Sequence, residues 1–477
     1  MPARAAANQV GITAFGAYIP RSRLGKDTKG WGLGYEKAVA NFDEDSVTLS
    51  VAAGVDCLRG IDRSKVDGVI FATTTSPYAE QQGAATIATA LDLRRDIFTT
   101  DVTNTLRAGS DALRQAVAAV RAGSAEQVLV AVADVRLAMP QSELDRNFGD
   151  GAASFLIGKG PDLIASIDGE STLSEHMVDT WRSSSEPFVR SWEERFVLEE
   201  GYQRILPEAV AGLFKKLNLT PAAITKACLY APDARRHADM AKRLGLAAQQ
   251  VQDPLMNNIG NTGAASALLM LAAALEAAKP GDRLLLATYG SGADAIALTA
   301  QEGVSVTPTG RRGVSKHLAS KAVLPDYATY LKWHELVPEE PPKRPLAQPL
   351  SIAALLRERD QNIRLYGARC KSCGRIQYPP QRVCVFCRAR DSYEHVRLSD
   401  KLAEVFTYSM DYLAGTKDIP LVIAILNMQG GGRILAMMTD RLIEEVKIGM
   451  TVEMSFRKIS VNTGVHNYYW KCVPLRA

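Results

Sequence analysis

Four cysteines in the C-terminal third of the chain form two C-x-x-C pairs. Cys370 and Cys373 are followed, after ten intervening residues, by Cys384 and Cys387. Each pair can supply two thiolates to one half of a tetrahedron, and the loop between them brings the halves together. Four thiolates leave no open coordination position, so the spacing predicts a structural zinc site. A redox-active pair is the alternative reading of C-x-x-C, but the duplication of the pair favours the metal.

A second candidate site is the segment from Thr103 to Ser110. Residues 96–102 read as a short apolar strand, and residues 108–122 have apolar residues at helical spacing. The segment is therefore expected to form a strand-to-helix turn that opens a buried helix. Unpaired N–H groups and the helix dipole stabilise negative charge at such a position, which suits a nucleophile.

Buried strands alternate with alanine-rich helices through the first 300 residues. The expected strands are 10–18, 66–73, 126–133, 152–157, 227–231, 283–288 and 293–300. The expected helices are 44–59, started by Asp43, and 84–91, 208–217, 236–244 and 264–277. Continuous apolar strands of this kind predict an α/β fold in which central sheets are covered on both faces, in two similar halves.

The last third of the chain has a different character. A proline-rich, charged segment at 337–345 marks a boundary, and residues 352–359 read as a short helix. Residues 401–474 then contain five short strands of alternating polarity, separated by glycine turns at 430–432 and 449. This pattern predicts a small barrel of the OB type.

The composition is that of an ordinary globular protein. The chain has 477 residues, of which 47% are hydrophobic and 23% charged, and a net charge of +4. Such a balance gives no electrostatic argument for nucleic acid, although a zinc ribbon with an OB barrel leaves nucleic-acid binding as an alternative. We find no apolar stretch long enough to span a membrane and no signal-peptide pattern, so we expect a cytoplasmic protein without a membrane partner. Cys57, Cys228 and Cys472 are expected to be free and buried.

Several motifs together carry a resemblance to a known family. They are the turn at 103–110 and the segments 72–78 (ATTTSPY), 179–182 (DTWR), 258–263 (NIGNTG), 289–295 (YGSGADA) and 327–333 (YATYLKW). From about residue 10 to about residue 335 the chain resembles the 3-hydroxy-3-methylglutaryl-CoA synthases and ketoacyl synthases III of the thiolase superfamily. Residues 352–475 resemble the OB-fold zinc proteins that accompany thiolases and these synthases.

The resemblance implies a particular fold and domain organisation. The expected fold is a thiolase-like α/β fold, a duplicated five-layer αβαβα arrangement, followed by a zinc ribbon and a small OB-fold β-barrel. The expected domains are the thiolase-like halves at 1–165 and 166–336, a linker at 337–350, a helix with the four-cysteine ribbon at 351–395, and the barrel at 396–477.

The same resemblance implies that most of the family's catalytic set is missing. The family's cysteine nucleophile falls on Leu106, its glutamate acid/base on Thr74, and its histidine on Tyr230; only the asparagine is retained, as Asn261. Leucine cannot form a thioester, and threonine cannot act as an acid or base near neutral pH. Tyr230 can still move a proton if a neighbour lowers its pKa. The alternative is a buried tyrosine that fills the space of the histidine.

Other residues are expected around the same pocket. Asp233 and Tyr78 are expected near Tyr230, with Asp233 as a third candidate catalytic residue and Tyr78 as a substrate contact. The backbone N–H groups of Gly290, Ser291 and Gly292, on a turn of small residues, are expected to bind substrate as an oxyanion hole.

None of the six histidines falls on a motif position of the family. His237 is expected on the helix that follows Tyr230, where a lone histidine is more often solvated than catalytic. His176 precedes the 179–182 segment and is a weaker candidate for the pocket.

The residues and the resemblance are compatible with two functions. In the first, the pocket makes or breaks a carbon–carbon bond next to a CoA thioester without an acyl-cysteine step, as in retro-aldol cleavage. In the second, the chain is a catalytically degenerate scaffold that shuttles acyl-CoA in a complex with an active thiolase. Both expect acyl-CoA as substrate or ligand and a homodimer, with a separate thiolase subunit as a further partner.

Overall fold

The computed structural model describes residues 9–306, 308–338, 340, 351–462 and 464–476. The chain divides into two compact units, each described by itself. Unit 1 comprises residues 1–40, 45–88 and 93–329, and unit 2 comprises residues 41–44, 89–92 and 330–477. The linker expected at 337–350 falls largely outside the described residues, which omit 339 and 341–350.

Among the described residues, unit 1 is built on a nine-stranded sheet of order β11-β12-β13-β8-β1-β7-β6-β4-β5. The bounds are β1 (Val10–Tyr18), β4 (Gly68–Thr73), β5 (Phe98–Thr103), β6 (Val128–Asp134), β7 (Gly151–Lys159), β8 (Ala165–Ser174), β11 (Lys226–Leu229), β12 (Arg283–Tyr289) and β13 (Gly292–Ala300). Strand β1 pairs with β8 over only two positions, and this narrow junction separates two halves. In the first half β4 is parallel to β5 and β6, and in the second β11 is parallel to β12.

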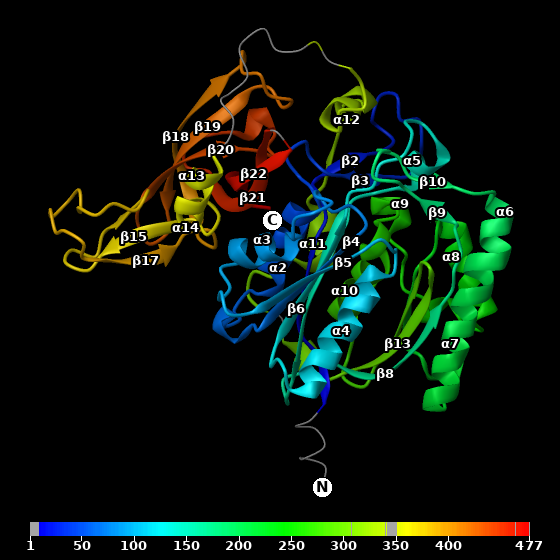
Figure 1. Cartoon of the computed structure of the whole chain (residues 1–477). Helices are drawn as coiled ribbons and strands as arrows, with labels where there is room; N and C mark the ends of the chain where they lie inside the picture. The colour runs from blue at the N-terminus through cyan, green and yellow to red at the C-terminus, as the bar shows by residue number, and fades with distance from the viewer. Residues whose placement is uncertain (1–8, 307, 339, 341–350, 463, 477) are drawn as a thin grey trace. The chain divides into compact units, whose positions relative to one another are not determined.

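Helices cover these half-sheets in layers. The bounds are α2 (Ser46–Cys57), α4 (Ala108–Ala122), α7 (Gln203–Leu217), α8 (Ala234–Arg243) and α10 (Ser266–Ala277). Helix α2 packs on β1 and β7, α10 contacts both β7 and β11, and α7 packs on β8 and β13. Figure 1 shows α4 and α10 between the two half-sheets, with α2 and α7 on their outer faces. This is the predicted αβαβα arrangement, and the prediction is confirmed.

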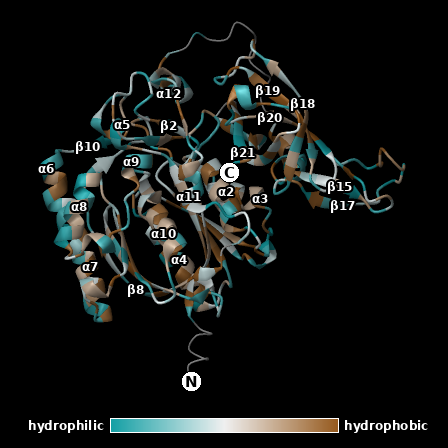
Figure 2. Cartoon of the chain, turned by 180° about the vertical axis from the view of Figure 1, so that it is seen from behind, coloured by the Kyte–Doolittle hydropathy of each residue, from teal (hydrophilic) through white to brown (hydrophobic). Residues whose placement is uncertain are grey.

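Sequence and position agree in these layers. Strands β4, β6 and most of β7 are buried along their length, because both faces are covered by helices. Helix α10 is apolar nearly all round, as a helix in the central layer must be. Helix α8 is strongly polar, and Figure 2 shows this contrast in its hydrophilic colour.

The start of the first helix differs from the prediction. Helix α2 begins at Ser46, and its N-cap is Asp45, whose side chain accepts hydrogen bonds from the backbone N–H groups of Val47 and Thr48. The prediction that Asp43 starts this helix is therefore wrong. Asp43 instead belongs to unit 2, where its carboxylate lies 3.1 Å from the Arg457 guanidinium.

Unit 2 contains a small sheet and a barrel. The sheet has the order β16-β15-β17, with β15 (Tyr366–Cys370), β16 (Ile376–Gln377) and β17 (Tyr393–Arg397). The closed barrel has the order β18-β19-β20-β22-β21, with β18 (Leu402–Asp411), β19 (Leu421–Met428), β20 (Arg433–Met438), β21 (Thr451–Asn462) and β22 (Val465–Pro474). The predicted five-stranded barrel is confirmed. Short helices α13 (Ile352–Arg357) and α14 (Arg359–Asn362) precede the small sheet.

No helix in the described part of the chain is both long and apolar enough to cross a membrane.

Candidate functional site

A cavity of about 210 Å³ lies in unit 1 at the carboxyl ends of its parallel strands. Leu106 follows β5, Arg136 follows β6, Tyr230 follows β11, and Tyr289 ends β12; all four line the cavity. The carboxyl ends of parallel strands lie at the same edge of a sheet, so the loops that leave them are close together. This explains why residues so distant in sequence meet here. The remaining walls come from residues 143–148, 179–180, 191–202, 232–233 and 261.

Leu106 occupies the strand-to-helix turn that the sequence predicts. The turn is tied to the second half of the unit, because Thr105 Oγ1 and Arg107 Nε both donate to the Gly290 carbonyl, at 2.8 and 3.0 Å. Arg107 also pairs with the buried Asp294 at 3.0 Å. A Cβ at Gly290 would lie 2.8 Å from the Leu106 nitrogen, so a glycine is required for this close approach. The turn therefore retains a defined geometry and presents a half-buried leucine to the cavity.

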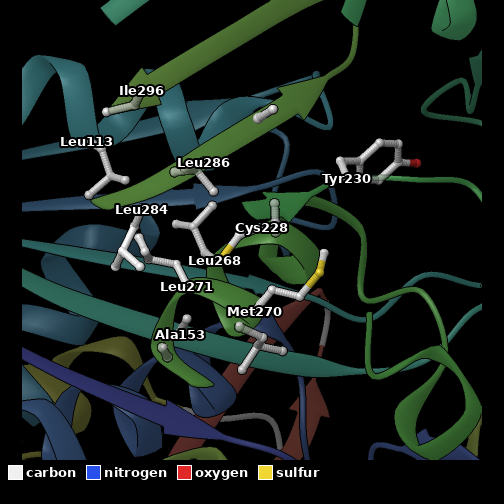
Figure 3. Packing of buried hydrophobic residues seen from close by; sticks show 14 of the residues in the cluster. Leu113, Ala153, Cys228, Tyr230, Leu268, Met270, Leu271, Leu284, Leu286 and Ile296 are labelled. Carbon is white, nitrogen blue, oxygen red and sulfur yellow. The ribbon is translucent and has the colours of Figure 1, made fainter. Parts of the chain in front are cut away.

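Tyr230 and Asn261 lie together in the cavity wall. Tyr230 is only 5% exposed, and Figure 3 shows its hydroxyl pointing away from the aliphatic side chains of the core. Asn261 Nδ2 donates to the Tyr230 hydroxyl at 3.5 Å and to the carbonyls of Ala231 and Pro232 at 3.1 and 3.2 Å. Asn261 therefore holds the loop that carries Tyr230, and its own carbonyl is held by the Gly263 N–H at 3.0 Å.

The ionisation of Tyr230 favours a proton donor over a base. Burial raises its pKa above 10.0, and the charge of Arg136 and the hydrogen bond from Asn261 oppose this effect only in part. The neighbours that could lower the pKa are thus present, but desolvation dominates. Near neutral pH the phenol keeps its proton and can donate it.

Arg136 is a second polar residue in the cavity, and it lies in none of the motifs described above. It is 5% exposed, and its guanidinium stacks 3.9 Å above the ring of Phe148. A Cβ at Gly263 would lie 2.7 Å from Arg136 Cδ, so the glycine makes room for this side chain. Arginine stays charged even where burial lowers its pKa, as it does here.

Aromatic residues and one buried carboxylate complete the wall. The rings of Tyr202 and Tyr289 meet edge to face at 5.7 Å, and Tyr202 donates to the Tyr230 carbonyl at 2.9 Å. Tyr202 ends a π-helical turn at Val197–Tyr202, a type of irregularity that often occurs at functional sites. Asp179 is 7% exposed and lines the cavity; burial, followed by the charge of Asp179, raises the pKa of Tyr289.

Asp233 lies at the edge of the cavity, where its carboxylate caps a helix. It accepts a hydrogen bond from the Arg236 backbone N–H at 2.9 Å and is the N-cap of α8. The Arg236 guanidinium lies 3.6 Å from the same carboxylate and also pairs with Glu194. These contacts account for Asp233 as a capping residue, and its proposed catalytic role remains a prediction.

Other residues selected from the sequence lie outside the cavity lining. Tyr78, Gly290, Ser291 and Gly292 are not among the residues that line it. The Gly290 N–H donates to the Gly292 carbonyl at 2.9 Å, so we do not assign it to an oxyanion hole. Thr74 directs its N–H and Oγ1 to Asp134, at 2.6 and 2.9 Å.

The two histidines also lie away from the cavity lining. His237 is on α8, as predicted, but it is 3% exposed, so the expectation of a solvated side chain is wrong. The amphipathic helix turns it inward, and burial lowers its pKa to about 4. His176 is exposed.

The cysteines of unit 1 offer no replacement nucleophile. Cys57 and Cys228 are both fully buried, in agreement with the prediction. Burial raises the pKa of Cys57 to about 12 and that of Cys228 higher still. A thiol that stays protonated within a packed core is inert, because the thiolate is the reactive form.

The four ribbon cysteines form one cluster in unit 2. The Sγ atoms of Cys370, Cys373, Cys384 and Cys387 all lie within 4.8 Å of one another. The contacts Cys370–Cys387 and Cys373–Cys384 are 3.6 and 3.7 Å, close to the ~3.8 Å edge of a tetrahedron with Zn–S bonds of ~2.3 Å. The residues therefore fit a four-thiolate zinc ion with a closed coordination shell.

The structure thus adds four residues to the site predicted from sequence: Arg136, Asp179, Tyr202 and Tyr289. Asp179 and Tyr289 begin two of the motifs singled out in the sequence, so a signal for them existed. Arg136 and Tyr202 lie in no such motif, and only the fold brings them to the cavity.

Comparisons with known proteins identify the class of protein to which this fold and site belong. The family model for the C-terminal part of 3-oxoacyl-[acyl-carrier-protein] synthase III matches residues 214–301. Models for the ChsH2 rubredoxin-like zinc ribbon and the ChsH2 C-terminal OB-fold domain match residues 357–393 and 395–457. A crystal structure of HMG-CoA synthase complexed with CoA aligns with a TM-score of 0.61 at 20% identity, covering 68% of this chain and 90% of that one. The 3-oxoacyl-(acyl carrier protein) synthase III of Pseudomonas aeruginosa aligns with a TM-score of 0.56 at 20% identity, covering 62% and 99%. The fold is that of a thiolase-superfamily protein joined to a zinc ribbon and an OB barrel.

Relatives that align with this chain over nearly their whole length identify one family within this class. The hydroxymethylglutaryl-CoA synthase of Aeropyrum pernix is 32% identical over 341 residues, which cover 68% of this chain and 94% of that protein. The synthase of Caldivirga maquilingensis is 32% identical over 345 residues, covering 69% and 98%. The chain belongs to the hydroxymethylglutaryl-CoA synthase family.

Proposed function

We propose that this protein acts on an acyl-CoA and makes or breaks a carbon–carbon bond next to the thioester without forming an acyl-cysteine. One observation carries the proposal: the cavity at the family's nucleophile turn presents Leu106, while a hydrogen-bond donor, Tyr230, and a buried carboxylate, Asp179, line the same space. Solved structures of the same fold contain CoA and 3-hydroxy-3-methylglutaryl coenzyme A, which supports a CoA thioester as the ligand.

A retro-aldol cleavage of a 3-hydroxyacyl-CoA fits these groups. Asp179 takes the proton of the 3-hydroxyl, the C2–C3 bond breaks, and its electron pair moves to the thioester carbonyl oxygen as an enolate. Tyr230 donates a hydrogen bond to that oxygen, and the proton held by Asp179 returns to C2. The products are an aldehyde or ketone and a shortened acyl-CoA, and the reverse sequence is an aldol addition.

The test is turnover by the purified full chain with 3-hydroxyacyl-CoA thioesters, with both products measured. We expect Tyr230→Phe to lower kcat by about 10²–10³-fold, the usual loss for one oxyanion donor. Tyr412→Phe is the control, since Tyr412 is 61% exposed in unit 2. Equal rates for the wild type and Tyr230→Phe would remove the tyrosine from the mechanism.

A degenerate, supporting subunit is the second candidate. The bonds from Thr74 to Asp134 favour it, because they occupy both the backbone and the side chain at the family's acid/base position. In this case the isolated chain would bind acyl-CoA without turning it over, and an intact thiolase would co-purify with it.

Further proposals concern unit 2 and assembly. We propose that the cysteine cluster holds a structural zinc ion and that the barrel binds or passes on acyl-CoA. We also propose a homodimer through β5, which lies at the edge of the sheet and, among the described strands, pairs only with β4. An edge strand that has no strand neighbour on one side is a site at which a second copy can pair.

A further inference from the structure

The geometry points to Arg136 and Tyr230 as a pair of donors that bind one carbonyl oxygen, the oxygen that becomes negatively charged when an acyl-CoA forms an enolate. The inference rests on the proposed function and deepens it, because it names the group that the cavity recognises. Two side chains then form the oxyanion hole, in place of the backbone turn predicted at 290–292.

Arg136 has unused hydrogen-bonding capacity inside the cavity. In the described part of the chain its guanidinium has no hydrogen-bond partner and no carboxylate at ion-pair distance, and it stacks on the ring of Phe148. An arginine that is 95% removed from solvent normally has a partner, since burying a charged group without one is costly. A ligand oxygen in the cavity would supply it.

Tyr230 supplies the second donor. Its hydroxyl oxygen accepts from Asn261, which leaves its own proton without an acceptor among the described residues. The ring of Tyr230 is fixed by Tyr202 and Tyr289, at 6.5 Å from each. The hydroxyl oxygen is therefore held in a defined place, and Tyr230 and Arg136 line the same cavity.

The surrounding charges favour a carbonyl oxygen over a carboxylate. Besides Tyr230, the carboxylates of Asp134 and Asp179 act electrostatically on Arg136, and Arg182 opposes them. Asp134 already accepts from Thr73, Thr74, Thr75 and the Ala264 N–H. At the rim, Arg236 holds Asp233 and Glu194, and Glu143 is exposed.

Nearby carboxylates, which make no hydrogen bond to Arg136, therefore already offset its positive charge. A further full negative charge would be repelled, whereas a neutral carbonyl is accepted and is stabilised as charge develops on it. This difference between ground state and transition state is what an oxyanion site requires.

The experiment uses acetoacetyl-CoA, whose enolate has its own ultraviolet absorption band. The full chain is saturated with this probe, and the enolate band is titrated against pH in the wild type, Arg136→Gln, Arg136→Lys and Tyr230→Phe. We expect the wild type to lower the midpoint below that of the free probe, and Arg136→Gln to raise it again by about one pH unit or more. Arg136→Lys, which keeps the charge but loses the planar fork, should lie between them.

Arg235→Gln is the matched control, because Arg235 is exposed on α8 and does not line the cavity. Binding of each protein to the probe and to CoA alone is measured in parallel by calorimetry. Bound probe with an unshifted midpoint, or a shift that survives Arg136→Gln, overturns the donor pair while leaving acyl-CoA binding intact. If the protein binds none of the CoA compounds, both the proposed function and the donor pair are overturned.

Discussion

Replacing Arg457 with glutamine should destabilise unit 2 by about 4 kcal/mol. Arg457 is 1% exposed, and its guanidinium contacts three carboxylates: Asp43 at 3.1 Å, Glu44 at 2.7 Å and Asp440 at 2.6 Å. Removing one partner from a buried ion pair costs about 3–5 kcal/mol, because the remaining charge stays buried without compensation.

The charges around Arg457 predict how this cost depends on pH. In the described cluster, the cations Arg457, Lys471 and Arg476 face the anions Asp43, Glu44 and Asp440, so the variant is left with one excess negative charge. Burial already raises the pKa of Glu44 to about 7, and Arg457 is the first influence that opposes this. In the variant Glu44 stays protonated to higher pH.

The sign of the effect follows from the protons bound. An acid with a raised pKa in the folded protein contributes most stability below its unfolded pKa, and that contribution is lost as the pH rises. In the variant Glu44 keeps its proton above pH 7, so this loss of stability continues to higher pH than in the wild type. The difference in stability between variant and wild type should therefore grow between pH 7 and pH 9, by up to about 1.4 kcal/mol per pH unit.

Hydrogen exchange in peptides from β21 and β22 measures the free energy of opening of the barrel directly. Arg433→Gln is the control. Arg433 lies exposed on β20, over the ring of Phe406 and with a hydrogen bond to Asn427 Oδ1, so its loss should change the free energy by no more than about 1 kcal/mol. If Arg457→Gln matched this control at both pH 7 and pH 9, the cluster would not stabilise the barrel.

Three further outcomes are expected. Cys373→Ser should lose zinc, measured by elemental analysis of the purified chain, with the wild type holding one ion per chain; zinc retained at full occupancy would contradict the four-thiolate site. Gly290→Ala should lower the free energy of unfolding of unit 1 by about 1–3 kcal/mol, because its Cβ would lie 2.8 Å from the Leu106 nitrogen, and an unchanged melting temperature would show that the turn tolerates it. His237 has a lowered pKa of about 4, so its contribution to stability is present above the unfolded value near 6.5 and is lost as the pH falls towards 4; His237→Gln should flatten that part of the acid-unfolding curve, and an unaltered curve would refute the assignment.

The fold was largely predictable because local patterns and tertiary positions agree. Apolar runs such as 126–133 coincide with strands covered on both faces, and the alternating residues of 421–428 coincide with a barrel strand that is half exposed. The sequence does not determine the start of α2, because Asp43 and Asp45 are both acceptable N-caps; in the folded chain Asp45 caps the helix and Asp43 belongs to the buried ion cluster.

The site was predictable only where a motif marked it. Tyr230 and Asn261 were found together because both fall on family positions. Arg136 could not be predicted in this way, because what marks it is burial without a hydrogen-bond partner, and that is a property of the folded chain. His237 looked solvated because neighbouring residues on α8 are charged, yet the helical period turns it inward.

The central claim is that the pocket works after losing its cysteine, and mass spectrometry of the reacting protein tests it most directly. The full chain is incubated with isotopically labelled acetyl-CoA and, separately, with a 3-hydroxyacyl-CoA, and peptides from unit 1 are searched for an acyl adduct while both cleavage products are measured. The account predicts cleavage of the 3-hydroxyacyl-CoA with no adduct on Cys57, Cys228 or any other residue of unit 1. A stable acyl-enzyme in that unit, formed at a rate that matches turnover, would contradict it.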